Sequence, residues 1–422
     1  MARIAIIGTG IAGNVTAYHL NKSHDITVYE ANDYIGGHTH THEIHMGSEK
    51  HQIDTGFIVF NRKTYPNFIN LLSKLGVSYQ KSDMSFSVAC EKTGLEYNGT
   101  TLNTLFAQRR NILRPSFHRM IQDILRFNKQ SAELLANNDH ILLGNYLSEN
   151  NYSSQFINHY IIPMGSAIWS MSDEQMMSFP AAFFVRFFTN HGMLSVNDRP
   201  QWYVIHNGSK SYLDALTSSY KSRIRTNAAV TEIERDQDKV IVRTSDSEQA
   251  FDYVFNACHS DQAYKQLKSP NKIENETIGL MEYQPNEVVL HTDSSLMPKR
   301  KLAWAAWNYH LLKEQSDRST LTYNMNILQS LKSDYTFCVT LNNTARIAPE
   351  KILKRLNYDH PLFTQASVNA QSRHREVNGS NRIYYCGAYW RFGFHEDGVV
   401  SALTALNHFY EDTQSEQQII LR

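Results

Sequence analysis

The chain has 422 residues, of which 41% are hydrophobic, so it can form about two or three domains with substantial cores. Lysine plus arginine and aspartate plus glutamate both number 41, and this balance gives no positive field for nucleic acid. The four cysteines form no C-x-x-C pair, and no stretch approaches the roughly 18 apolar residues of a membrane span. We expect a cytoplasmic protein that binds no nucleic acid.

A glycine motif lies between a predicted strand and a predicted helix near the start of the chain. Arg3–Ile7 is a short apolar run typical of a buried parallel strand, and a helical stretch follows over residues 14–21. Between them lies G-x-G-x-x-G, in which Gly8 permits a tight turn, Gly10 lets the backbone approach a pyrophosphate, and Gly13 lets helix and strand pack closely.

The residues after this motif complete a dinucleotide-binding pattern. Ile11 and Ala12 open the helix, whose free N–H groups and dipole attract an anion. A second predicted strand over residues 25–29 ends in Glu30, an acid placed to accept hydrogen bonds from ribose hydroxyls. The sequence therefore predicts a βαβ unit that binds a dinucleotide.

A second glycine pair and four histidines come next. Gly36 and Gly37 follow Glu30-Ala31, and Thr55-Gly56-Phe57 follows Asp54. The histidines His38, His40, His42 and His45 could bind a metal, because alternation puts the first three on one face of a strand. No acid or cysteine completes a tetrahedral set, so we predict no metal. A solvated strand face and a cofactor contact through His38 stay open.

A basic segment lies in the helix-rich stretch from Leu102 to Phe188. It carries Arg109, Arg110, Arg114, Arg119, Arg126 and Lys129 among apolar residues. Two interpretations stay open: an amphipathic surface that rests on anionic lipid at the inner membrane, or a solvated face over a stripe packed in the core.

The second half of the chain is predicted to contain strands and two helices. Residues 202–205 and a helix over 212–216 precede a predicted hairpin, 228–233 with 239–242, and a buried strand over 252–257. Further strands are predicted over 286–291, 302–307 and 335–340. The last strand, 383–388, contains Gly387, and Gly393–Ala402 opens a final helix.

These motifs resemble those of flavoproteins of the amine oxidase and phytoene desaturase superfamily. Such proteins carry E-x(5)-G-G and then D-x-G after the first glycine motif, as this chain does from Glu30 to Gly56. The segment G-A-Y-W-R-F-G-F-H-E-D-G is similar to that of a bacterial branch of NAD/FAD-binding proteins often encoded beside cyclopropane-fatty-acyl synthases. The resemblance implies an α/β fold, with a Rossmann-like FAD-binding domain and an inserted α+β substrate domain.

The resemblance also implies a set of cofactor contacts and a domain division. Val230 would contact the adenine, His38 would replace a pyrophosphate-binding arginine, and the final helix would point at the flavin pyrimidine ring. The FAD-binding residues would be Gly8, Gly10, Ile11, Ala12, Gly13, Glu30, Ala31, Gly36, Gly37, His38, Thr39, Thr55, Gly56, Phe57, Val230, Gly387, Glu396, Asp397, Gly398 and Val399. Residues 1–80, 200–285 and 366–422 would form the FAD domain, and 81–199 and 286–365 the substrate domain.

The chemistry implied by the resemblance is a two-electron oxidation. In amine oxidases the stretch corresponding to Tyr389, Trp390 and Phe392 walls the substrate against the flavin. Monoamine oxidases also use a lysine on a substrate-domain strand, and the strand after Gln284 has no lysine in register. We expect hydride transfer from a hydrophobic substrate such as a fatty-acyl chain. An amine oxidase, or a non-catalytic flavoprotein partner of a lipid-modifying enzyme, stays open.

Overall fold

The computed structural model describes residues 1–137, 140–195, 199–314, 318–415 and 417–422. Residues 138–139, within the predicted helix-rich stretch, lie outside the described residues. No helix among the described residues is long and apolar enough to cross a membrane.

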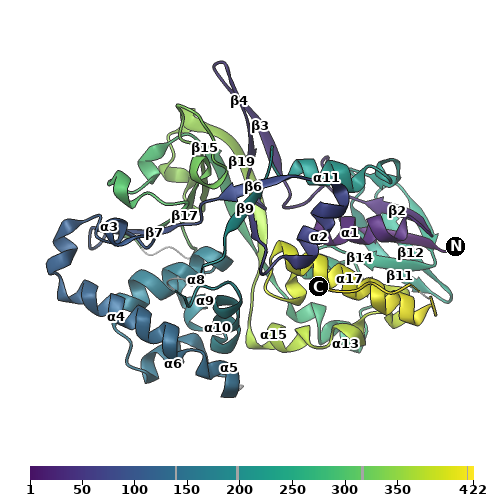
Figure 1. The fold of residues 1–422 in the computed structure, drawn as a ribbon. Coiled ribbons are helices and arrows are strands. Elements are labelled where there is room, and N and C mark those ends of the chain that lie inside the picture. The colour runs from purple at the N-terminus through teal and green to yellow at the C-terminus, as the bar shows by residue number, and fades with distance from the viewer. Residues whose placement is uncertain (138–139, 196–198, 315–317, 416) are drawn as a thin grey trace.

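A five-stranded parallel sheet forms one half of the molecule (Figure 1). Its order is β10 (Ile224–Arg225), β2 (Asp25–Tyr29), β1 (Arg3–Ile7), β14 (Tyr253–Asn256) and β20 (Ile383–Tyr385). The strands come from three distant parts of the chain, and their apolar side chains are buried because helices and a second sheet cover the faces. The predicted strands 3–7, 25–29 and 252–257 thus lie side by side.

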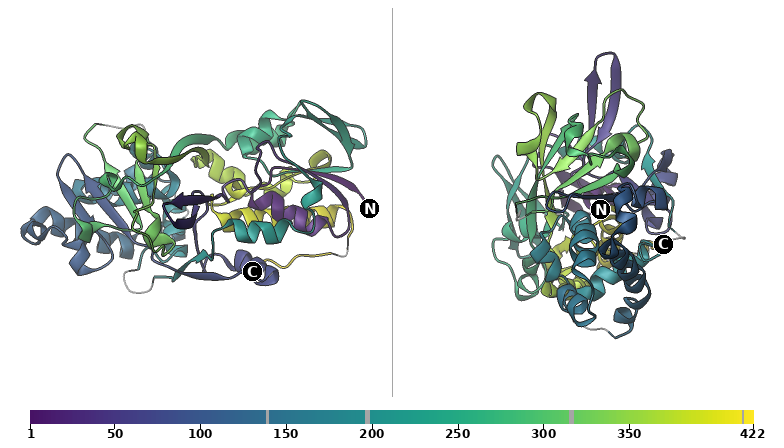
Figure 2. Two further views of the ribbon diagram at one scale, coloured as in Figure 1. Left: turned by 90° about the horizontal axis from the view of Figure 1, so that it is seen from above. Right: turned by 90° about the vertical axis from the view of Figure 1, so that its left-hand side faces the viewer.

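Helices and a small antiparallel sheet cover this parallel sheet (Figures 1 and 2). The helices are α1 (Ile11–Leu20), α2 (Pro66–Leu75), α11 (Lys210–Thr217), α12 (Ser260–Lys265), α13 (Lys272–Asn275), α15 (Gln365–Gln371), α16 (His374–Val377) and α17 (His395–Asp412). The small sheet contains β11 (Val230–Asp236), β12 (Lys239–Thr244) and β13 (Glu248–Phe251), and β11 pairs with β12 as the predicted hairpin.

A seven-stranded mixed sheet forms the other half with a group of helices. Its order is β19 (Ile352–Pro361), β15 (Tyr283–His291), β18 (Cys338–Leu341), β17 (Leu321–Asn324), β16 (Trp307–Leu311), β7 (Phe86–Cys90) and β8 (Leu95–Asn98). The helices are α3 (Leu102–Leu105), α4 (Pro115–Gln130), α5 (Glu133–Asn137), α6 (Leu143–Glu149), α7 (Ser154–Phe156), α8 (Ile162–Trp169), α9 (Asp173–Met177) and α10 (Ala181–Asn190). A further short helix, α14 (Met325–Leu328), follows β17.

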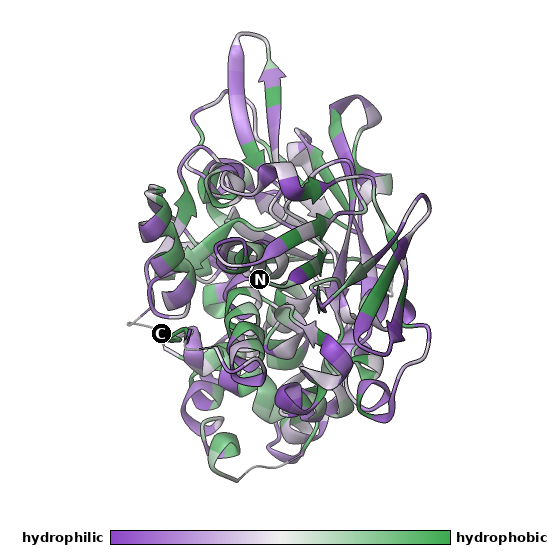
Figure 3. Ribbon diagram, turned by 90° about the vertical axis from the view of Figure 1, so that its right-hand side faces the viewer, coloured by the Kyte–Doolittle hydropathy of each residue, from purple (hydrophilic) through white to green (hydrophobic). Residues whose placement is uncertain are grey.

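Two small antiparallel sheets lie at the junction of the halves. One contains β5 (Val59–Asn61), β9 (Trp202–Ile205) and β6 (Tyr79–Ser82). The other is the hairpin of β3 (Thr41–Met46) and β4 (Glu49–Asp54), which projects from the molecule and carries mostly hydrophilic residues (Figure 3).

In the mixed sheet the strand predicted over 302–307 was wrong, and the strand predicted over 335–340 was right only for residues 338–340. The stretch 302–307 forms the 3-10 turn η6 (Lys301–Ala303) before β16, because Trp304 Nε1 donates to the Pro298 carbonyl and Ala305 N donates to Asn308 Oδ1. The stretch 335–340 becomes a strand only at Cys338, because the Asn326 side chain bonds the backbone of Tyr335 and Phe337.

Candidate functional site

The first glycine loop leaves open space above the start of α1. A Cβ at Gly13 would lie 2.0 Å from the Gly8 carbonyl oxygen, so only glycine fits where α1 packs on β1. Gly8 has a φ of +95°, which favours glycine. A Cβ at Gly10 would meet no atom within 4 Å. No side chain caps α1, which begins with Ile11 and Ala12, so its first N–H groups are available to an anion.

Glu30 lies beside this loop, at the end of β2. Its carboxylate accepts hydrogen bonds from the backbone N–H of Thr9 at 3.1 Å and from the Thr9 hydroxyl. The backbone N–H and the side-chain amide of Asn32 donate to the other oxygen, each at 2.9 Å. These four donors hold the carboxylate next to the glycine loop, while the following Ala31 is exposed.

The second glycine pair lies against the first loop. Gly36 and Gly37 have φ values of +118° and +58°, and a Cβ at Gly37 would lie 3.2 Å from the Gly10 Cα. Two backbone segments without side chains therefore meet at the start of α1. This close approach brings Glu30, Gly10 and Gly37 together, although 27 residues separate the two glycines.

His38 follows this pair and is half-buried, and its Nε2 atom is buried without a hydrogen-bond partner. Burial lowers its pKa to about 3, so the imidazole is neutral. Its ring centroid lies 4.9 Å from that of Tyr358, 5.7 Å from that of His360 and 5.9 Å from that of His259. The Nδ1 atom of His259, which follows β14, is also buried without a hydrogen bond and lies 3.9 Å from the Asp359 carboxylate.

The predicted histidine face is right for His40 and His42 and wrong for His38. His40 precedes β3, but its ring centroid lies 4.1 Å from that of His42 in this strand. His38 lies instead near Tyr358 and His360. Among the described residues, no three or more histidine, cysteine, aspartate or glutamate side chains are arranged to hold a metal ion.

The segment Thr55-Gly56-Phe57 runs beside His38. A Cβ at Gly56 would lie 2.2 Å from the His38 carbonyl oxygen, and Phe57 N donates to that oxygen at 2.7 Å. The Phe57 ring stacks on His395 at the start of α17. The Tyr212 hydroxyl hydrogen bonds His395 Nε2 at 2.8 Å and Thr39 Oγ1 at 2.5 Å, so both predicted motifs join one buried network.

Asp54, which the sequence reasoning did not select as a site residue, anchors this segment. Its buried carboxylate accepts hydrogen bonds from Thr41 Oγ1 at 2.5 Å and from Ser209 N and Oγ at 2.9 and 2.8 Å. Burial raises its pKa to about 6. The first position of the D-x-G pattern is the sequence signal that could have identified it.

The start of α17 packs on the start of α1. A Cβ at Gly398 would lie 2.6 Å from the Ile11 Cγ2 atom, and the neighbouring Val399 is buried in the same core. The N-termini of both helices therefore converge. Gly387, just after β20, donates its N–H to Ser401 Oγ of α17 at 2.9 Å.

The two acids in the first turn of α17 have protein partners. Glu396 accepts hydrogen bonds from the N–H groups of Asn67 and Phe68, at 3.0 and 2.9 Å, and so stabilises the start of α2. Asp397 accepts from Phe394 N at 2.9 Å and lies 3.3 Å from Arg391 Nε. Each carboxylate thus stabilises the start of a helix. It would influence a bound cofactor only through that helix.

The predicted aromatic wall is not one surface. Tyr389 and Trp390 lie in the core between the parallel sheet and β11–β13, which also contains Val230, and Trp390 stacks on His374 with centroids 4.1 Å apart. Phe392 lies in the core of the helical half, 4.7 Å from Phe183 between ring centroids. The structure does not bring all three side chains together.

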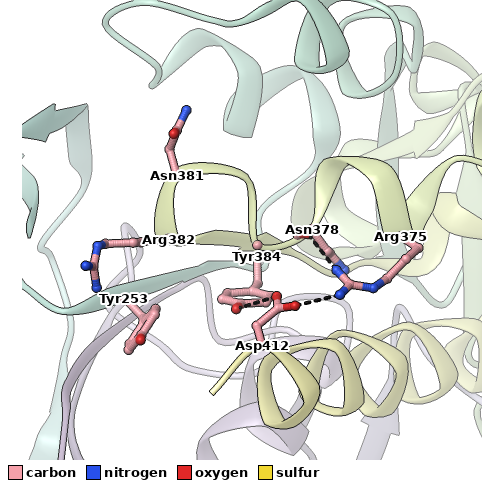
Figure 4. A pocket seen from close by; sticks show the side chains of 8 residues that line it. Tyr253, Arg375, Asn378, Asn381, Arg382, Tyr384 and Asp412 are labelled. Carbon is pink, nitrogen blue, oxygen red and sulfur yellow. Dashed lines mark hydrogen bonds and ion pairs between the residues drawn. The ribbon is translucent and has the colours of Figure 1, made fainter. Parts of the chain in front are cut away.

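A cleft of about 440 Å³ lies elsewhere, at the amino ends of β14 and β20 (Figure 4). Tyr384 Oη donates to Asp412 at 2.9 Å, and Arg375 pairs with Asp412 at 2.5 Å. Ligands of parallel α/β sheets bind at the carboxyl ends of the strands, where the glycine loops lie. This cleft is therefore not the dinucleotide site.

The residues at the carboxyl ends of the strands fit a flavin dinucleotide. Gly10 and Gly37 leave room for a pyrophosphate beside the uncapped start of α1. The buried atoms His38 Nε2 and Tyr389 Oη have no hydrogen-bond partner in the protein, and buried polar atoms are normally hydrogen bonded. A polar ligand would supply the missing partners.

Comparison with known proteins agrees with this geometry. The family described as flavin containing amine oxidoreductase matches residues 11–337. No curated protein matches the sequence significantly. Cyclohexylamine oxidase from Brevibacterium oxydans is similar in structure, with 13% identity and a TM-score of 0.70 over 98% of this chain and 99% of that chain.

Two further solved structures share the fold. The CLA-producing fatty acid isomerase from P. acnes has 15% identity and a TM-score of 0.70 over 97% of this chain and 99% of that chain. Putrescine oxidase bound to putrescine has 14% identity and a TM-score of 0.68 over the same shares. These likenesses confirm the predicted α/β fold class of the flavin amine oxidase type.

Proposed function

Because this chain belongs to the family of flavin-containing amine oxidoreductases, we propose that it is an FAD-dependent enzyme that oxidises a hydrophobic substrate. The substrate we propose is a fatty-acyl chain or a related lipid. The observation that carries the proposal is the open space at Gly10, bounded by Gly37, by Glu30 and by the converging starts of α1 and α17.

The proposal of FAD rather than FMN rests on the adenosine end of this site. Glu30 follows β2 at the position where the dinucleotide motif places the ribose acid, and Val230 is buried at the start of β11. A mononucleotide has no adenosine that could contact either residue. Glu30 would bind the ribose, the start of α1 would bind the pyrophosphate, and His38 would hydrogen bond the cofactor through Nε2.

The bound flavin would supply the redox chemistry by accepting a hydride. The chain's own residues would bind and orient it and exclude water. The dipole of α17 would stabilise negative charge on the reduced cofactor, and the stacked pair of Phe57 and His395 would close the site beside it. Burial keeps His395 neutral by lowering its pKa, so it adds no fixed charge.

The proposal of an apolar substrate rests on the helical half. Phe392, which follows the β20 segment, packs in a core that contains Phe183, Phe184, Phe187 and Phe363. Phe392 is three residues before His395 in the chain, so this core of aliphatic and aromatic side chains adjoins the candidate flavin site. One structural neighbour acts on a fatty acid, which agrees with this substrate class.

A second candidate is oxidation of an amine, which the titles of two structural neighbours name. Against it, β15 (Tyr283–His291) contains no lysine. A third candidate is a flavoprotein that serves a lipid-modifying enzyme as a partner without turnover.

Anaerobic reduction separates the three candidates. The purified flavoprotein is mixed with unsaturated fatty acids, phospholipids and primary and secondary amines, and the bleaching of flavin absorbance is followed. We expect bleaching with a lipid and none with amines. Bleaching by amines alone would establish the amine oxidase. If no compound bleaches the flavin, and flavin strengthens a complex with a lipid-modifying enzyme, the chain is the non-catalytic partner protein.

A further inference from the structure

Three aliphatic side chains project from the end of the helical half. Leu113 is 86% exposed, Leu102 is 76% exposed and Ile112 is 49% exposed. Leu102 begins α3, while Ile112 and Leu113 end the 3-10 helix η1 (Arg109–Leu113). We call α3, η1 and Arg114 the α3–η1 tip.

The same segment carries arginines without acidic partners. Arg109 donates to Asn103 and to the Phe106 carbonyl, Arg110 donates to the Gly94 carbonyl, and Arg114 reaches Asn111 Oδ1 at 3.5 Å. Among the residues that the structure describes, none of the three forms an ion pair. These contacts orient the guanidinium groups but leave their charges uncompensated.

The charge of the surrounding segment is strongly one-sided. Residues 99–130 contain six lysines and arginines and a single acid, Asp123. Asp123 is buried and pairs with Arg119 at 3.3 Å and Arg126 at 3.0 Å. The whole chain has no net charge, so the tip is a local positive surface on a neutral protein.

The tip continues onto the neighbouring turn η6. This turn packs against α3 and contains Lys301 and the 38% exposed Leu302. Figures 1 and 2 show the α3 region at the end of the molecule, away from the parallel sheet and both chain termini. A flat partner can therefore approach the tip without meeting the rest of the protein.

We propose that the α3–η1 tip docks on an anionic lipid bilayer, with Leu102 and Leu113 inserted among the acyl chains and Arg109, Arg110 and Arg114 at the lipid phosphates. Exposed aliphatic side chains beside unpaired arginines match the layered chemistry of a membrane interface. Helix α4 behaves differently, since Phe117, Met120 and Phe127 are buried in the core. Under this proposal, the lipid-facing interpretation of the basic segment applies to the α3–η1 tip. The interpretation as a solvated face over a core-packed stripe applies to α4.

A single-stranded nucleic acid fits the tip less well. Binding of single-stranded nucleic acid uses aromatic side chains for base stacking, and the exposed apolar residues of the tip are aliphatic. The proposal does not depend on the enzymatic function, because it rests on surface charge and exposure alone. Docking on a bilayer would, however, bring a lipid substrate close to the protein.

Vesicle sedimentation tests the docking. The full chain is mixed with vesicles of phosphatidylcholine alone and of phosphatidylcholine with phosphatidylglycerol, at low and high salt. We expect binding to the anionic vesicles only, weakened by salt. The variant R109Q/R110Q/R114Q should bind roughly a hundredfold more weakly, as three interfacial cations are lost. The variant L102Q/L113Q should bind at least about tenfold more weakly.

The matched control is K210Q/K265Q/K272Q, which removes three exposed lysines from the other half of the molecule. It should bind anionic vesicles as the unchanged protein does. Circular dichroism and thermal unfolding check that each variant folds, and L102Q/L113Q changes only exposed side chains. Absence of binding, equal weakening in the control, or full binding by L102Q/L113Q would each overturn the proposal. So would stronger binding to heparin or RNA than to anionic vesicles.

Discussion

His395 stacks face to face on Phe57, with ring centroids 3.6 Å apart and ring planes 9° apart. Phe57 belongs to the D-x-G segment near the start of the chain, and His395 begins the last helix. Tyr212, from the middle of the chain, hydrogen bonds His395 Nε2 at 2.8 Å. Three distant segments are therefore fixed to one another at the candidate flavin site.

The His395 contacts predict a graded loss of stability. His395→Phe keeps an aromatic ring on Phe57 but removes a hydrogen bond, so the free energy of unfolding should fall by about 1 kcal/mol. His395→Ala also removes the stacked ring and leaves a cavity, so it should cost about 3 kcal/mol. Urea unfolding measures both. Equal effects would show that the stacking contributes nothing.

Gly10 and Gly13 form a matched pair for testing the cofactor site. A Cβ at Gly10 meets no protein atom within 4 Å, so Gly10→Val should fold normally and bind no flavin. A Cβ at Gly13 would lie 2.0 Å from the Gly8 oxygen, so Gly13→Ala should prevent normal folding. Solubility, thermal unfolding and flavin absorbance check both. A folded, yellow Gly10→Val protein would contradict the pyrophosphate placement.

Glu30→Ala should weaken FAD binding by about 1.5–3 kcal/mol, the scale of a hydrogen bond to a charged group. Its removal also leaves Thr9 and Asn32 without their acceptor, so the free energy of unfolding should be measured in parallel. Glu30→Gln is the matched control, because it keeps the side-chain shape. If calorimetry finds unchanged FAD affinity in Glu30→Ala, Glu30 does not bind the ribose.

The structure also predicts a pH-dependent stability through Asp54. Burial raises its pKa to about 6 in the folded protein, above the ordinary aspartate value of 3.8. The folded state therefore binds the proton more tightly than the unfolded state does. The stabilisation that results is complete at low pH and is lost as the pH rises from about 4 to 6. The loss amounts to roughly 3 kcal/mol at most.

Asp54→Asn isolates this effect, because asparagine does not titrate. Urea unfolding of both proteins should show the unchanged protein losing stability relative to Asp54→Asn as pH rises to 7. A stability difference that stays constant with pH would show that Asp54 has an ordinary pKa.

The glycine motifs and the parallel strands could be predicted because their requirements are local. Gly13 is needed wherever this helix packs on this strand, and the apolar run Arg3–Ile7 is typical of a strand buried on both faces. The strand predicted over 302–307 was wrong, because the side chains of Trp304 and Asn308 fix a turn that hydrophobic periodicity does not reveal.

Long-range contacts lay outside what the sequence could predict. The proximity of His38, His259 and His360 depends on three segments meeting in space. In the same way, Tyr389 and Phe392 are three residues apart in the chain but lie in different cores, because the backbone turns between them. Motif position alone could not separate these two side chains.

We propose that the carboxyl ends of the parallel strands bind FAD. Acid release of the flavin from the purified protein, followed by chromatography and quantification against the protein, tests it most directly. We predict FAD, one molecule per chain. Recovery of FMN, or of no flavin after reconstitution with FAD, would contradict the account.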